Sequence, residues 1–193
     1  MNIYLIRHSK PDVPEGTFYG QSDVDVTKAE FEQTVARIRE KMDLTEIKTI
    51  YTSPLKRCSL LAHALQPDHS TIHTDNRIME LDFGAWELQK WDNIDPKALG
   101  QWINDFVYAP TPGGESHMDL YKRVAGFWDE TIQNSNGPMA VVTHGGVIKS
   151  IFSRILETPL NKSYSIKVHY GELISTQYFG ENQYEIEFLT SPE

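Results

Sequence analysis

Short apolar runs alternate with amphipathic segments along the first 156 residues of the chain. Each run is three to five residues long and bounded by turn formers, which predicts a buried strand. In the segments between the runs, apolar residues recur at helical spacing, as Phe31, Val35, Ile38 and Met42 do. The predicted strands are 3–6, 48–52, 71–73 and 139–143, and the predicted helices are 27–42, 53–65, 95–106, 116–133 and 145–156.

The starts of three helices carry capping signals. Thr27 with Glu30 and Ser116 with Asp119 have the spacing of a capping box. Ser53 followed by Pro54 predicts an N-cap residue and a proline in the first helical position. Strands that alternate with such helices predict an α/β fold with a largely parallel sheet.

The last forty residues change to the period of β-strands. The segments 168–170, 173–179 and 184–189 predict strands, with turns at 171–172 and 180–182. We therefore expect one domain over residues 1–193. Its mostly parallel central sheet would be flanked by helices on both faces and completed by antiparallel C-terminal strands.

Composition narrows the class of protein. The chain has 193 residues, 39% of them hydrophobic, and Cys58 is its one cysteine, which fits a reducing compartment. The net charge of −9 argues against nucleic-acid binding, which depends on neutralising phosphates. We see neither a membrane-spanning run nor a secretory signal, so we expect a cytoplasmic protein without a membrane partner. The oligomeric state stays open, with a homodimer as one state to test.

Residues suited to phosphate follow three of the predicted strands. Arg7 and His8 follow the first strand, Arg57 lies in the first turn of a predicted helix, and His144 precedes Gly145 and another helix. The carboxyl ends of parallel strands share one edge, and helix N-termini favour anions. The glycine lets backbone amides approach a ligand. These residues therefore predict one phosphate site.

Each residue also has an ordinary structural explanation. Arg57 could be a surface arginine and His144 a buried core histidine, and two-residue motifs such as Arg7-His8 arise often by chance. The joint placement at one type of junction favours the site. A metal centre has little support, because the histidines lack ligand spacing, and we expect no cofactor. Structural roles are expected for the remaining histidines, His63, His69, His73, His117 and His169.

Four motifs in this order resemble the histidine phosphatase superfamily, the family of cofactor-dependent phosphoglycerate mutase and related phosphatases. Within the superfamily, the residues of three stretches are most similar to the alpha-ribazole phosphatase branch. The superfamily motifs are Leu-Ile-Arg7-His8, Ser53-Pro-Leu-Lys-Arg57-Cys, Glu80-Leu-Asp-Phe-Gly-Ala-Trp-Glu87 and Thr143-His144-Gly-Gly, and the branch-like stretches are 7–11, 19–23 and 57–62.

The resemblance implies a metal-independent phosphomonoesterase. His8 would attack phosphorus and become phosphohistidine, and Glu80 would protonate the leaving alkoxide and then activate water. Arg7, Arg57 and His144 would hold the phosphoryl oxygens. On the branch resemblance the substrate is a small-molecule phosphate such as alpha-ribazole 5′-phosphate, an intermediate of cobalamin biosynthesis, with Tyr19 and Gln21 as substrate-binding residues.

Alternatives remain at this stage. Ser9-Lys10 replaces the Gly-Glu of many members, which disfavours a phosphoglycerate mutase but leaves it open. A non-catalytic phospholigand-binding module is the other class of function. Asp82 and Glu87 are rivals of Glu80 as the acid, and Glu115 is a further candidate for contact with substrate. We expect the alcohol part of the substrate to meet the loops 11–26 and 87–118.

Overall fold

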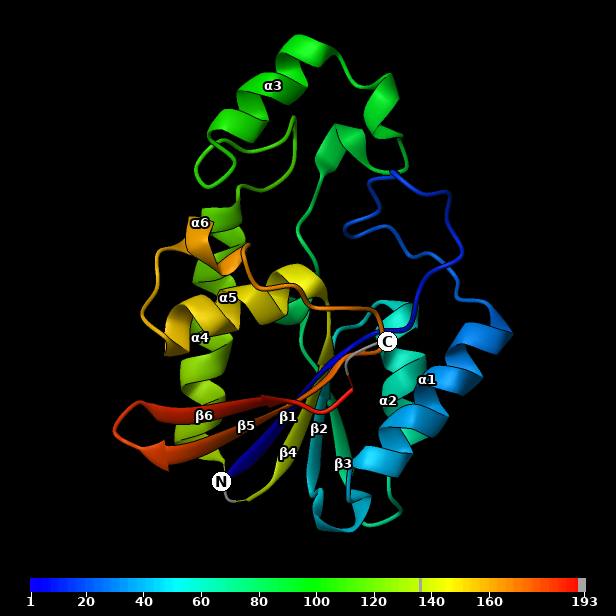
Figure 1. Cartoon of the computed structure of the whole chain (residues 1–193), viewed down its shortest axis with the longest axis vertical. Coiled ribbons are helices and arrows are strands. Elements are labelled where there is room, and N and C mark those ends of the chain that lie inside the picture. The colour runs from blue at the N-terminus through cyan, green and yellow to red at the C-terminus, as the bar shows by residue number, and fades with distance from the viewer. Residues whose placement is uncertain (136, 191–193) are drawn as a thin grey trace.

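The computed structural model describes residues 1–135 and 137–190, which fold around one six-stranded sheet (Figure 1). The strand order is β3-β2-β4-β1-β5-β6, with β1 to β4 parallel and β5 and β6 antiparallel. This is the expected α/β fold. The strands are β1 (Asn2–Arg7), β2 (Thr49–Thr52), β3 (Thr71–Thr74), β4 (Met139–Thr143), β5 (Leu173–Gly180) and β6 (Gln183–Phe188).

Helices cover both faces of the sheet. Alternate residues of β1 point to opposite faces, so Leu5 packs with Phe127 and Ile151 on one side, and Ile6 packs with Ile38 and Leu61 on the other. None of the described helices is long and apolar enough to cross a membrane. The helices are α1 (Lys28–Lys41), α2 (Lys56–Leu65), α3 (Pro96–Asn104), α4 (His117–Asn134), α5 (Gly145–Ile155) and α6 (Leu160–Ser163), with 3₁₀ turns at Leu44–Glu46, Asn76–Ile78, Gly84–Trp86 and Trp91–Asn93.

The predicted caps agree with the structure at two helices and fail at a third. Thr27 caps α1, and Ser116 with Asp119 forms the capping box of α4. The prediction for Ser53 was wrong, because α2 begins at Lys56 and its N-cap residue is Leu55. The Ser53 hydroxyl bonds the ring of His144 instead.

The C-terminal strands are confirmed with one exception. Residues 168–170 were predicted as a strand, but they are irregular and lead into a turn before β5. The backbone of this segment bonds to the residues at the end of β1. The Val168 carbonyl accepts a hydrogen bond from the Arg7 side chain, and the N–H of the following Gly171 donates to the His8 carbonyl. The short helix α6 after Pro159 was not predicted.

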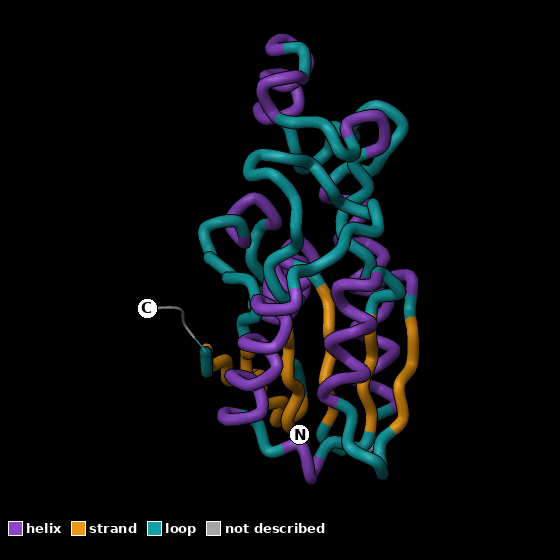
Figure 2. The backbone as a smooth tube through the Cα atoms, turned by 90° about the vertical axis from the view of Figure 1, so that its right-hand side faces the viewer, coloured by secondary structure: helices purple, strands orange, loops and turns teal. Residues whose placement is uncertain are grey.

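The carboxyl ends of the parallel strands carry a second layer of loops and helices. In both views α3 and the 3₁₀ turns before it rise beyond this edge of the sheet (Figures 1 and 2). The loop 11–26 joins this layer through hydrogen bonds between Phe18 and the backbone of Leu88 and Gln89. The second layer thus covers the carboxyl edge of the sheet.

Candidate active site

His8 lies directly beyond β1 and is buried, with 1% of its surface exposed. Its backbone N–H donates to the Thr143 carbonyl, and its ring Nδ1 lies 2.7 Å from the Ser9 carbonyl oxygen. A carbonyl oxygen accepts hydrogen bonds and cannot donate them, so Nδ1 carries the proton. The lone pair of the ring is therefore on Nε2, the atom available for nucleophilic attack.

Burial lowers the pKa of His8 well below its ordinary value, and the charges of Arg57 and Arg7 lower it further. The ring is consequently neutral near pH 7. A neutral imidazole is the nucleophilic form of histidine.

His144 lies beside His8 because the register of β1 and β4 pairs the preceding residues, Arg7 and Thr143. The two imidazole centroids are 5.1 Å apart. The Nε2 atom of His144 is 2.8 Å from the Ser53 hydroxyl, and burial followed by the charge of Arg57 lowers the pKa of this ring as well. Two neutral histidines thus share one buried edge of the sheet.

Arg57 brings a positive charge to the same edge from the first turn of α2. Its side chain is fully buried, and its terminal nitrogens donate to the carbonyls of Ser22, at 2.8 Å, and Gly20, at 2.5 Å. Within the described residues no carboxylate pairs with it. A buried guanidinium held by carbonyls alone keeps its full charge for an anion.

Arg7 forms the other side of this positively charged site. One terminal nitrogen donates to the Val168 carbonyl at 2.6 Å, and the guanidinium carbon lies 3.8 Å from the centre of the Tyr170 ring. Gly145, the first residue of α5, is packed so closely that a Cβ there would lie 3.2 Å from the Arg7 guanidinium carbon. The predicted phosphate residues Arg7, Arg57, His144 and Gly145 are therefore gathered around His8.

Glu80 reaches the site from the segment before the 3₁₀ turn at Gly84. Its carboxylate accepts hydrogen bonds from the N–H groups of Leu81, at 3.0 Å, and Gly146, at 3.1 Å. A Cβ at position 146 would collide with this carboxylate, so glycine there leaves Glu80 in its present position. Glu80 thus sits at the N-terminus of α5, near Gly145 and Arg7.

Arg123 of α4 holds the Glu80 segment in place. Its guanidinium donates to the carbonyls of Arg77, Met79 and Glu80, and it forms a two-pronged ion pair with Glu115 at 2.8 Å. Local sequence pattern does not indicate this role, because Arg123 is 43 residues from Glu80 along the chain.

The three other acids considered from the sequence are engaged with the backbone. Glu87 accepts from the N–H groups of Gln21, Ser22 and Phe83, and Asp82 accepts from Gly84. Glu115 accepts from the Asp82 N–H in addition to its pairing with Arg123. This leaves Glu80 as the acid among these that lines the cavity described next.

A cavity of about 440 Å³ opens from Arg7, Glu80 and Gly145 toward the second layer. Tyr19 lines it, whereas Gln21 lies behind the wall and donates its side-chain amide to the Glu80 carbonyl. The far walls carry aromatic and basic side chains that sequence reasoning did not assign to a site, including His117, for which a structural role was expected. These residues are Phe18, Phe83, Trp91, Trp102, His117, Lys149 and Tyr164.

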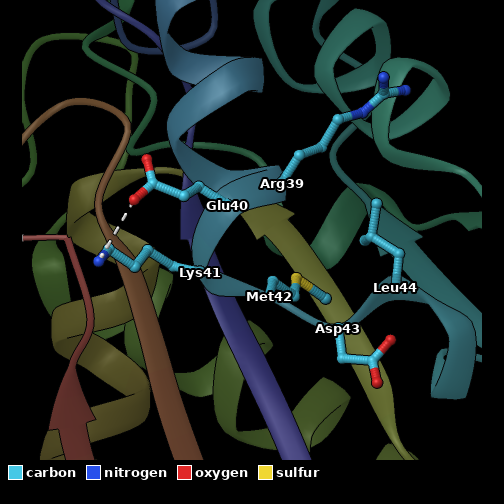
Figure 3. Close-up of a pocket in the computed structure, with 6 residues that line it drawn as sticks. All are labelled: Arg39, Glu40, Lys41, Met42, Asp43 and Leu44. Atoms are coloured by element: carbon cyan, nitrogen blue, oxygen red, sulfur yellow. Dashed lines mark ion pairs between the residues drawn. The ribbon is translucent and has the colours of Figure 1, made fainter.

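A second hollow, of about 610 Å³, lies at the end of α1, and it is a weaker candidate (Figure 3). Figure 3 shows Glu40 paired with Lys41, at 3.6 Å. Asp43 caps the next turn through Thr45, and Arg39 donates to the Ala64 carbonyl. The hollow precedes β2, so it lies at the opposite edge of the sheet from His8. In residues 1–135 and 137–190 no group of three or more His, Cys, Asp or Glu side chains could hold a metal ion.

Comparison with known proteins shows the family to which the chain belongs. Residues 3–190 match the histidine phosphatase superfamily (branch 1). The chain is 26% identical to phosphoserine phosphatase 1 of Hydrogenobacter thermophilus, covering 86% of this chain and 81% of that protein. It is 22% identical to the adenosylcobalamin/alpha-ribazole phosphatase of Escherichia coli, covering 89% and 87%.

A solved structure shows the same fold. The alpha-ribazole phosphatase from Shigella flexneri superposes with a TM-score of 0.87 at 22% identity, covering 99% of this chain and 96% of that one. The match over residues 3–190 establishes the family, and the relatives are phosphatases. The chain belongs to the histidine phosphatase superfamily and is a phosphoric monoester hydrolase.

Proposed function

We propose that the chain hydrolyses small-molecule phosphomonoesters without a metal ion, through a phosphohistidine formed on His8. The observation that carries this proposal is the state of the His8 ring. Its Nδ1 is committed to the Ser9 carbonyl, so Nε2 bears the lone pair, and two arginines and His144 surround it.

The first chemical step transfers the phosphoryl group. Nε2 of His8 attacks phosphorus, the bond from phosphorus to the alcohol oxygen breaks, and Glu80 gives its proton to that oxygen. Arg7, Arg57 and the N-terminus of α5 stabilise the negative charge on the equatorial oxygens. These groups supply the positive charge that a metal ion provides in other phosphatases.

The second step releases phosphate. A water molecule attacks phosphorus while Glu80, now a carboxylate, takes up its proton, and the bond from phosphorus to Nε2 breaks. The products are inorganic phosphate and the original neutral His8. Glu80 can serve in both steps because it lines the cavity from which the alcohol leaves and the water enters.

Alpha-ribazole 5′-phosphate is our candidate substrate. The aromatic lining supports it, since Phe18, Trp91 and Trp102 offer faces to a planar ring. The Escherichia coli relative is named for this activity. Its kcat/KM should exceed that for ribose 5-phosphate, which has the same phosphorylated position without the ring. Equal values would remove this substrate and leave the phosphatase assignment.

Turnover of p-nitrophenyl phosphate and of a phosphomonoester panel after exhaustive chelation tests the general proposal. The rates should stay near those before chelation. Loss of activity that magnesium or zinc restores would contradict the metal-free mechanism. Phosphate exchange between positions of phosphoglycerate without release would indicate a mutase, and binding without turnover would indicate a non-catalytic module.

A further inference from the structure

Tyr170 contacts the phosphate site from the turn before β5. The guanidinium carbon of Arg7 lies over the Tyr170 ring, 3.8 Å from the ring centre, which is a cation–π contact. The same ring is 5.7 Å from the imidazole of His8. Apart from this ring, Arg7 has the Val168 carbonyl as its side-chain partner, and its Nε is buried without a partner in the described part of the chain. The orientation of Arg7 therefore depends on residues 168–170.

The Tyr170 hydroxyl is bonded to the hydroxyl of Tyr19 at 2.5 Å. Tyr19 belongs to the loop 11–26, and the guanidinium carbon of Arg57 lies 5.3 Å from its ring centre. The two tyrosines thus connect segments 151 residues apart in sequence, and each ring faces one of the two arginines. We call this pair the tyrosine clasp.

The site beneath the clasp is closed in this conformation. His8 is 1% exposed, and Arg57 and His144 are fully buried. The cavity is bounded by Arg7, Tyr19 and Glu80, whereas His8 and Arg57 are not among its lining residues. For attack, phosphorus has to come within about 3–3.5 Å of Nε2. The phosphoryl group therefore cannot reach the nucleophile unless part of this cover moves.

We propose that the tyrosine clasp gates His8 and that Tyr170 is a positioning residue for Arg7. In the free protein, the bond between the two hydroxyls holds the cover closed, and the Tyr170 ring keeps Arg7 directed at the site. An entering phosphoryl group separates the hydroxyls and takes their place between the two arginines. The proposal rests on the proposed function, because it assumes that phosphate binds beside His8.

The clasp makes opposite predictions for the hydroxyl and the ring of Tyr170. Tyr170→Phe and Tyr19→Phe each remove the bond that competes with the ligand, so the closed state loses population and phosphate binds more tightly. The expected gain is roughly fivefold, the size of one neutral hydrogen bond. Tyr170→Leu removes the ring as well as the hydroxyl and frees Arg7, so it should bind inorganic phosphate more weakly than Tyr170→Phe does.

The test measures two quantities without turnover. Calorimetry gives the affinity for inorganic phosphate, and mass spectrometry after brief diethyl pyrocarbonate treatment gives the modification rate at His8. Both should rise in Tyr19→Phe and Tyr170→Phe. The double variant should match the single ones, because both changes remove the same bond. Tyr178→Phe, a tyrosine of β5 that packs against Tyr184, should match the unchanged protein.

Unchanged affinity and unchanged His8 modification in both phenylalanine variants would overturn the gate. Additive effects in the double variant would do the same, since they show that the hydroxyls act independently. Phosphate binding in Tyr170→Leu as tight as in Tyr170→Phe would overturn the positioning role, because the two variants differ only in the ring. Failure of the proposed function would look different: the protein without any substitution would bind phosphate but form no phosphohistidine.

Discussion

The two ends of the active-site cavity are built in different ways. At the phosphate end, His8, Arg57 and His144 follow neighbouring strands of one sheet, and hydrogen bonds to main-chain carbonyls hold His8 and Arg57. At the alcohol end, the walls are side chains from α3, α4 and α5, from two loops, and from Tyr164, which follows α6. The first end is fixed by the sheet, and the second by packing between distant segments.

This difference separates the chemistry from the choice of substrate. Changes at the phosphate end should lower the rate on every phosphomonoester by a similar factor. Changes at the alcohol end should alter the ratio between substrates. Glu80 lies where the two ends meet, so its effect should depend on the leaving group.

Glu80→Gln should cause the largest change. An alkoxide leaving group needs a proton as the bond breaks, whereas p-nitrophenolate needs little help, so kcat/KM should fall by about 10²–10⁴-fold on alkyl phosphates and much less on p-nitrophenyl phosphate. The comparison uses kcat/KM because dephosphorylation is common to both substrates. Glu87→Gln serves as the control.

Equal losses on the two substrates in Glu80→Gln would show a structural role for this residue. A selective loss in Glu87→Gln or Asp82→Asn would transfer the acid to that position. Both of those carboxylates accept backbone hydrogen bonds, so we expect their variants to lose stability without leaving-group selectivity.

Arg57→Met should lower kcat by about 10²–10³-fold, because it removes one preorganised donor to the developing negative charge. The factor should be the same for ribose 5-phosphate and alpha-ribazole 5′-phosphate. Lys56→Met is the matched control, since the neighbouring lysine is exposed and its ion pair with Asp25 is 3.7 Å long. A loss of kcat that differs strongly between the two substrates would contradict the separate roles of the phosphate end and the alcohol end.

The buried histidines of the phosphate end should also make stability depend on pH. The pKa values of His8 and His144 are lowered in the folded protein, so both rings stay neutral there while the unfolded chain takes up protons below about pH 6.5. The free energy of unfolding should therefore fall on acidification below that value, with a slope that approaches about 1.4 kcal/mol per pH unit for each ring.

Urea unfolding at pH 7.5, 6.5 and 5.5 measures this slope. His8→Asn should remove the contribution of one ring, and the difference between the two proteins cancels the effect of other groups. A variant with the same pH slope as the unchanged protein would show that folding does not lower the pKa of His8.

Trp102→Leu should have the smallest effect and act at the alcohol end. The loss of one aromatic face should lower the ratio of kcat/KM for alpha-ribazole 5′-phosphate over ribose 5-phosphate by about tenfold. Ile103→Ala, an exposed neighbour on the same helix, should leave the ratio unchanged. An equal loss on both substrates would mean that Trp102 supports the phosphate end as well.

The same contrast explains how far the sequence could be interpreted. His8, Arg57 and His144 stand next to apolar runs, so local pattern places them at one sheet edge. Tyr170 and Arg123 have no such signal, because their partners lie far away in sequence. The helix cap predicted at Ser53 was wrong for a related reason. The Ser53 hydroxyl bonds the His144 ring and does not cap α2. Tertiary contacts override local preference at these positions.

The central claim is that Nε2 of His8 carries the phosphoryl group. The most direct measurement mixes the protein briefly with ³²P-labelled substrate, denatures it, and locates the label on peptides. We predict an acid-labile, base-stable phosphate at His8, and no label in a folded His8→Ala protein. Label that survives in His8→Ala, or an acid-stable phosphate on another residue, would contradict the account.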